Sequence, residues 1–233
     1  MTGLTPDEWE IILLSLKVAF WSVLCSLPVA VAVALLLARS NFPGKSLFDA
    51  LVHLPLVLPP VVIGYFLLLT MGRRGPVGAV LEDYFGIVVA FRWTGAAIAA
   101  GIMGFPLMVR AIRLSIEAID SGLEAAARTL GATRWRVYAT VTLPLALPGI
   151  LTGALLSFAR SLGEFGATIT FVSNIPGETR TLPLAIYAFT QVPGGDTAAL
   201  RLSVIAIVLS VLALMLSEYF VRRAQRRGKG QDA

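Results

Sequence analysis

The sequence predicts an all-α integral membrane protein with about five transmembrane helices in a single domain, residues 1–233. The chain is 57% hydrophobic and only 14% charged, whereas a soluble domain carries about 25% charged residues. The apolar residues gather in runs that approach or exceed the ~20 residues needed to cross a bilayer. Lys and Arg cluster between these runs and at the C-terminal end, so the net charge of +5 indicates a membrane rather than nucleic acid.

The first two predicted spans cover residues 11–38 and 51–71. Lys17 lies about two turns into the first, close enough to the interface to snorkel back to it. The second contains Pro59 and Pro60 in succession, which remove two backbone donors and bend the helix. In lipid such a break is tolerated only where protein or a water-filled path covers the freed carbonyls. Two interpretations stay open, a break beside a translocation path and a packing kink.

The remaining predicted spans cover residues 94–112, 145–169 and 202–220, and a loop over residues 72–92 precedes the first of them. The first of the three is rich in Gly and Ala, which suits close helix packing. Between the last two lies an apolar island at residues 182–192, too short to cross a bilayer. It is interpreted as a re-entrant or a surface helix.

The longest stretch suited to water lies in mid-chain, at residues 120–150, and overlaps a predicted loop at residues 113–144. Ser121 and Glu124 match an S-x-x-E capping box, which predicts a helix beginning there. Gly131 follows where a helix commonly ends in a left-handed residue. A smooth apolar face at helical spacing is formed by Leu123, Ala126, Ala127 and Leu130. The residues alone leave two readings, a docking helix and a hairpin without a partner.

Residues 125–144 resemble the cytoplasmic EAA loop of ABC importer permeases. The shared pattern is a pair of alanines, Gly131, nine residues, and then Val-Thr-Leu-Pro ending at Pro144. In that family the loop is a coupling helix that docks in a groove of the ATPase subunit. The family's glutamate aligns with Ala125, and the carboxylate here lies one residue earlier, at Glu124. The resemblance assigns ATPase coupling to Glu124, Ala125, Ala126, Gly131, Leu143 and Pro144.

Other stretches resemble the permeases for tetrahedral oxyanions. SLGEFGA at residues 161–167 is typical of that subgroup, and its continuation at residues 168–181 is most similar to permeases for molybdate. Residues 42–45 and 54–62 agree with the same subgroup, so the resemblance spans nearly the whole chain. It implies an importer permease for molybdate. Permeases for tungstate, sulfate or thiosulfate have the same architecture and stay open as alternatives.

The resemblance also implies the partners. We expect a homodimer with the path at its interface, two ATPase subunits, and a periplasmic or extracellular oxyanion-binding protein, within membrane lipids and without nucleic acid. The sequence has no G-x-x-x-x-G-K-[ST] loop, so ATP hydrolysis is expected in a separate chain and this chain is not expected to be an enzyme. An ATP-independent anion channel would not need the coupling loop. A membrane enzyme would need a richer polar set than Arg160, Glu164 and His53.

Arg160 and Glu164 are four residues apart in the predicted fourth span, and therefore on one helix face. Because a charge at membrane depth costs about 3 kcal/mol, we expect an intramembrane ion pair, either structural or beside the path. Ser161 and Thr168 could donate hydrogen bonds to a passing oxyanion. Candidate path or gate residues are therefore Pro59, Pro60, Ser161, Glu164 and Thr168. Cys25 and His53 are single, so we expect no disulfide, metal or cofactor.

Five spans place the chain ends on opposite sides, and the positive-inside rule chooses the sides. Segments 39–45, 110–144 and 222–229 hold twelve Lys and Arg residues. The segments on the other side hold five, namely Arg73, Arg74, Arg92, Arg180 and Arg201. We therefore expect a multi-pass protein of the bacterial inner (cytoplasmic) membrane, with the N-terminus outside and the coupling loop and C-terminus in the cytoplasm. The acidic N-terminal segment has no basic n-region, so no cleaved signal peptide is expected.

Overall fold

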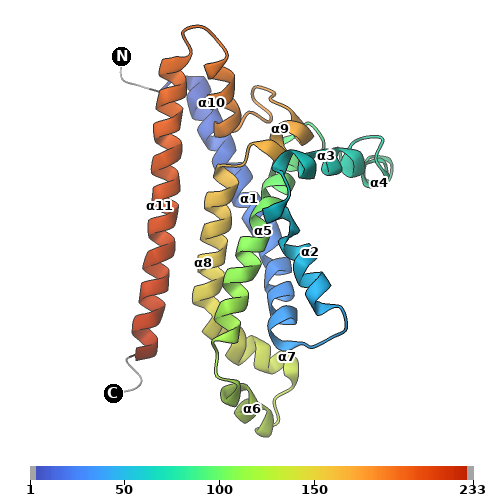
Figure 1. Ribbon diagram of the computed structural model, residues 1–233, viewed down its shortest axis with the longest axis vertical. Helices are drawn as coiled ribbons and strands as arrows, with labels where there is room; N and C mark the ends of the chain where they lie inside the picture. The colour runs from blue at the N-terminus through green and yellow to red at the C-terminus, as the bar shows by residue number, and fades with distance from the viewer. Residues whose placement is uncertain (1–3, 230–233) are drawn as a thin grey trace.

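The computed structural model describes residues 4–229 of the chain, and the side chains of residues 4–220. All regular elements in this range are helices, which confirms the predicted all-α class (Figure 1). The long helices are α1 (Pro6–Arg39), α5 (Trp93–Glu117), α8 (Leu143–Leu162) and α11 (Asp196–Lys229). The shorter ones are α2 (Lys45–Val57), α3 (Pro60–Met71), α4 (Pro76–Phe85), α6 (Ser121–Thr129), α7 (Arg134–Val137), the π-helix η1 (Tyr138–Thr142), α9 (Gly166–Val172) and α10 (Leu182–Thr190).

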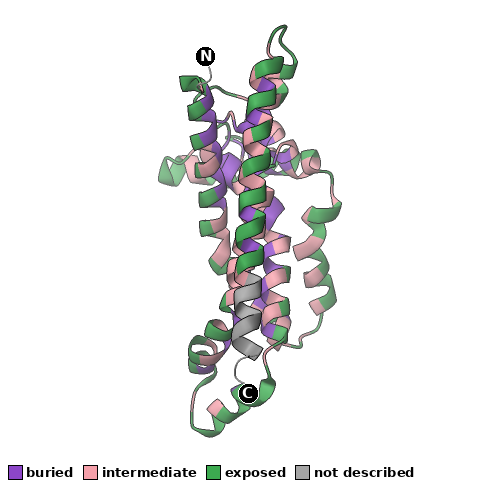
Figure 2. Ribbon diagram, turned by 90° about the vertical axis from the view of Figure 1, so that its left-hand side faces the viewer, coloured by how far each residue is buried: buried purple, intermediate pink, exposed green. Residues whose placement is uncertain are grey.

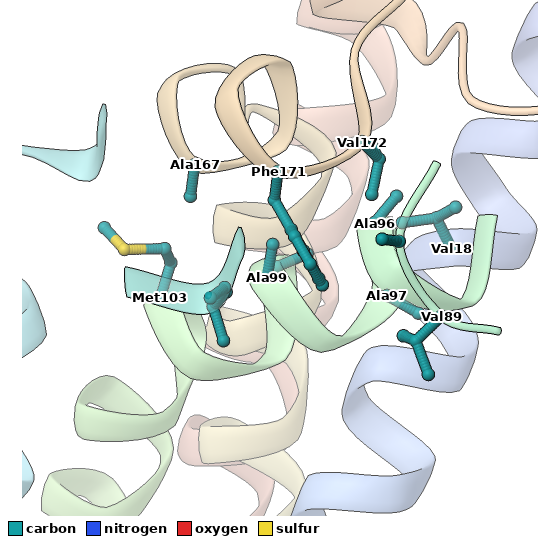
Figure 3. Close-up of a cluster of buried hydrophobic side chains, with 12 residues drawn as sticks. Val18, Val89, Ala96, Ala97, Ala99, Met103, Ala167, Phe171 and Val172 are labelled. Carbon is teal, nitrogen blue, oxygen red and sulfur yellow. The ribbon is translucent and has the colours of Figure 1, made fainter. Parts of the chain in front are cut away.

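Helix α5 is the centre of the bundle and packs against both α1 and α8. In its apolar stretch 67% of residues are buried, against 17% in α11, which lies on α8 and α10 at the edge of the bundle. Figure 2 shows this contrast, with exposed residues along α11 and buried ones inside the bundle. Small residues allow the close approach: Phe171 of α9 packs onto Ala96 and Ala99 of α5 (Figure 3).

The predicted second span is two helices that meet at an angle of 110°. The residue before a proline is driven out of the helical region, and this happens twice in succession here. Leu58 precedes Pro59 and is extended at ψ 143°, and Pro59 precedes Pro60 and has ψ 131°. Helix α2 therefore ends at Val57, and α3 begins on Pro60. Within residues 4–229, four helices are long and apolar enough to cross a membrane, and the bent pair supplies a fifth span if it counts as one.

Two of the segment predictions are wrong. The helix expected over residues 145–169 ends at Leu162, because the chain breaks at residues 163–165 before α9 begins. The loop expected at residues 72–92 contains a helix, α4. In both places the apolar composition does not mark the break. The apolar island at residues 182–192 does form a helix, α10, which packs against α1 and α11.

The two ends of the bundle carry different elements (Figure 1). The N-terminal end of α1 and helix α10 lie at one end, which we call the α10 end. The segment α6–α7 and the C-terminal end of α11 lie at the other, which we call the α6 end. The segments that the positive-inside rule groups together therefore share one end of the molecule.

Candidate functional site

Helix α6 is capped at both ends by residues that directly flank it in the sequence. Asp120 is the N-cap, and its Oδ1 accepts a hydrogen bond from the Gly122 N–H at 2.8 Å. The capping box expected from Ser121 and Glu124 is therefore wrong, because Asp120 takes the N-cap position and the Glu124 side chain turns elsewhere.

The C-terminal end of α6 is a Schellman motif. Gly131 has φ +86°, which confirms the expected left-handed residue. Its N–H donates to the Arg128 carbonyl at 2.9 Å, and the Ala132 N–H donates to the Ala127 carbonyl at 3.1 Å. Both bonds satisfy carbonyls that the end of a helix leaves free.

Glu124 is the one buried residue of α6, with 2% of its surface exposed. Its Oε1 accepts a hydrogen bond from Arg39 Nε at 3.1 Å and lies 3.0 Å from Arg39 Nη2. The Thr142 hydroxyl donates to the same oxygen at 2.9 Å, while Arg128 Nη2 lies 3.6 Å from Oε2. A buried carboxylate needs such partners to offset its lost hydration. The side chain thus fixes α6 to the end of α1 and to η1.

Arg39 extends this joint to α5. Its Nη2 donates to the carbonyl oxygens of Ile116 at 2.9 Å and of Ile119 at 3.4 Å. These carbonyls lie at the C-terminal end of α5, where a cation is favoured by the helix dipole. One guanidinium therefore joins α1, α5 and α6. This role of Arg39 is not visible in the sequence, because its partners lie 77 to 85 residues away.

The face of α6 opposite Glu124 is open. Ala125 and Ala126 are exposed, and Leu123 and Leu130 expose 50% and 89% of their surface. The residues expected to complete the coupling motif lie at the start of α8, where Leu143 is half-buried and Pro144 is exposed. An anchored helix with an open apolar face can receive another protein surface.

The two broken helices meet each other within the bundle. Helix α3 packs on α9, and glycines make the contact close. A Cβ on Gly166 would lie 2.8 Å from Pro60 Cβ, and one on Gly64 would lie 2.5 Å from the Ala167 carbonyl oxygen. The bend after Val57 and the break after Leu162 are therefore one structural unit, which we call the break site.

Glu164 lies at the break site and is 2% exposed. Its Oε1 accepts a hydrogen bond from the Ala167 N–H at 2.8 Å, so it satisfies a free donor in the first turn of α9. Its Oε2 lies 2.7 Å from Arg160 Nη2, in an ion pair whose N–H bonds are not aligned on the oxygen. The pair thus bridges the end of α8 and the break, instead of lying on one continuous helix.

The hydroxyls expected near the path are buried within the chain. Ser161 Oγ lies 3.0 Å from Ser22 Oγ and 3.4 Å from the Ala100 carbonyl, and Thr168 is 2% exposed. A cavity of about 700 Å³ lies between α1, α2 and α5, and one of about 620 Å³ lies between α8, α10 and α11. Neither is lined by any of the expected path residues Pro59, Pro60, Ser161, Glu164 and Thr168. In the described part of the chain no three His, Cys, Asp or Glu side chains gather as a metal site.

Residues 27–226 match the family model of the binding-protein-dependent transport system inner membrane component. The chain belongs to this family. As an inner membrane component with several apolar helices, it is a multi-pass membrane protein. The four or five apolar spans and the helix anchored outside them are thus parts of a transporter subunit.

Relatives cover nearly the whole permease. It is 61% identical over 224 residues to the molybdenum transport system permease protein ModB of Escherichia coli K12, covering 96% of this chain and 98% of that protein. It is 58% identical over 227 residues to the protein of the same name from Haemophilus influenzae, covering 97% and 99%. Its fold matches a chain of the bacterial alginate ABC transporter in complex with an alginate pentasaccharide-bound periplasmic protein. That match has a TM-score of 0.73 and 17% identity, over 94% of this chain and 80% of that one.

Proposed function

We propose that this chain is the transmembrane permease subunit of an ATP-driven ABC importer whose cargo is molybdate. The observation that carries the cargo is the 61% identity, across 96% of the chain, to a permease named for molybdenum transport. The oxyanion-type sequence at residues 161–181 supports the same cargo, and its first part, residues 161–167, lies at the break site.

The protein partners follow from the anchored helix α6. Its open face receives an ATPase subunit, and the permease is a homodimer with two such subunits and the translocation path at its interface. An external binding protein delivers the anion at the α10 end, and the α6 end faces the cytoplasm. The Glu124–Arg39 joint supports this assignment, because a docked ATPase that moves α6 would also move α1 and α5.

Selection of the cargo is left to the binding protein. Few fixed cations lie at membrane depth in the described residues, and Lys17 Nζ lies 3.8 Å from the centre of the Trp93 ring in a cation–π contact. Arg160 is paired with Glu164. A path with few free charges discriminates little between dianions and releases them readily.

Uptake into vesicles tests this function. Vesicles that carry the permease with its ATPase and binding protein should accumulate labelled molybdate only with ATP. Excess tungstate should compete and excess sulfate should not. Strong competition by sulfate and none by tungstate would move the assignment to a sulfate permease. Uptake without ATP would instead indicate an anion channel.

A further inference from the structure

A small polar pocket lies at the α6 end, between the end of α1 and the segment α6–α7. Its volume is about 180 Å³, below the 300–1,000 Å³ typical of pockets for drug-sized ligands. Three arginines and a tyrosine contribute to its lining, which consists of Arg39, Ser40, Arg128, Arg134, Val137 and Tyr138. These residues come from the end of α1, from α6 and from the α7–η1 segment.

Positive charge is in excess around this pocket. The carboxylate joined to its lining residues is Glu124, whose Oε1 is already taken by Arg39 and Thr142. Arg128 reaches the other oxygen only at 3.6 Å. Arg134 forms no ion pair with any described residue. Three guanidinium groups therefore line the pocket, and the one carboxylate joined to them pairs with only two, those of Arg39 and Arg128.

We propose that this pocket binds a single tetrahedral oxyanion. Guanidinium groups present forks of N–H donors that match the oxygens of such an anion. Arg128 and Arg134 have donors to spare, and the hydroxyls of Ser40 and Tyr138 add two more at the lining. The space admits a small anion and excludes a nucleotide or a peptide. The anion is either a free inorganic oxyanion or the phosphate of a lipid headgroup, because the pocket lies where a membrane span ends.

Equilibrium binding tests the free-oxyanion source. The nucleotide-free permease–ATPase complex is placed in nanodiscs of phosphatidylcholine, and binding of labelled molybdate and of inorganic phosphate is measured. Arg134→Gln should lower the affinity of a site about tenfold, the effect of losing one charge-assisted contact. Arg136→Gln is the matched control, because Arg136 is exposed two residues away and does not line the pocket. It should bind like the wild type.

Lipid retention tests the other source. In nanodiscs that contain phosphatidylglycerol, native mass spectrometry should count one retained anionic lipid that Arg134→Gln loses and Arg136→Gln keeps. Binding of free oxyanion should fall in these nanodiscs if the headgroup occupies the pocket. A specific loss in Arg134→Gln in either assay supports the proposal. Equal binding and equal lipid retention in the three proteins would overturn it, as would equal losses in both variants.

Discussion

The Glu124 carboxylate and the Arg39 guanidinium do not depend on each other equally. Without Arg39, the buried carboxylate keeps Thr142 and a distant Arg128, and the Ile116 and Ile119 carbonyls lose their donor. Without Glu124, Arg39 keeps both carbonyls and is 17% exposed. A buried charge left unpaired is worse than no pair. The two single variants should therefore differ in severity.

We expect Arg39→Ala to lower the stability of the permease by about 3 kcal/mol, the lower range for breaking a buried pair. Glu124→Ala should cost less than this. It should cost more than the ~1 kcal/mol typical of a lost N-cap bond, because Glu124 accepts two buried hydrogen bonds, from Arg39 and Thr142. The Arg39→Ala/Glu124→Ala double variant should recover part of the loss. Thermal melting of the detergent-solubilised protein measures the order. A double variant that melts lower by the sum of both single effects would mean that the residues do not interact.

A second pair of variants concerns Arg160 and Glu164. Arg160→Ala should lower assembly, because it leaves a buried carboxylate that lacks its cation. Glu164→Gln removes that charge and keeps an oxygen to accept from the Ala167 N–H. Adding Glu164→Gln to Arg160→Ala should therefore restore assembly, measured as the yield of the permease–ATPase complex. Full assembly of Arg160→Ala with lost uptake would instead place Arg160 on the path.

Some helix ends can be predicted from the neighbouring sequence, and others cannot. The end of α6 was predictable, since Gly131 is a local signal. The break after Leu162 was not, because α9 is as apolar as α8 and the donor that Glu164 satisfies is visible only in three dimensions. The same holds for Glu124, whose place in the sequence predicts a cap while Arg39 and Thr142 draw it into the bundle. The spans follow from composition, but the joints between them depend on distant partners.

Gly131→Leu tests α6 as the docking helix. A side chain at φ +86° costs about 1–2 kcal/mol, and its Cβ would meet nothing within 4 Å. The variant should therefore insert in the membrane, yet bind the ATPase more weakly or stimulate it less. Gly44→Leu is the matched control, because Gly44 has φ +83° and equally open surroundings but lies outside the segment α6–α7, at the start of α2. Normal ATPase stimulation in Gly131→Leu would remove the docking assignment.

At the scale of the whole molecule, the Glu124–Arg39 joint and the break site lie at different heights along the same bundle (Figure 1). Helix α5 contacts the joint through its C-terminal carbonyls and carries the residues that pack on α9. The run from α7 through η1 to α8 is continuous and ends at the break. Helices α5 and α8 pack against each other. We therefore propose that a displacement of α6 would reach the break site through these two adjoining helices.

The orientation of the bundle is tested by cysteine labelling in a Cys25→Ser background, since Cys25 is itself exposed. Arg227→Cys, whose side chain lies outside the described residues, should react only from the cytoplasmic side. Thr5→Cys should react only from outside, although it gives up the hydrogen bond to the Glu8 N–H at the start of α1. Gln191→Cys, exposed after α10, reports on the same end without that loss. Labelling of Arg227→Cys and Thr5→Cys from one side would mean an even number of spans between the chain ends. That result would require the bent α2–α3 pair to enter and leave the membrane on the same side.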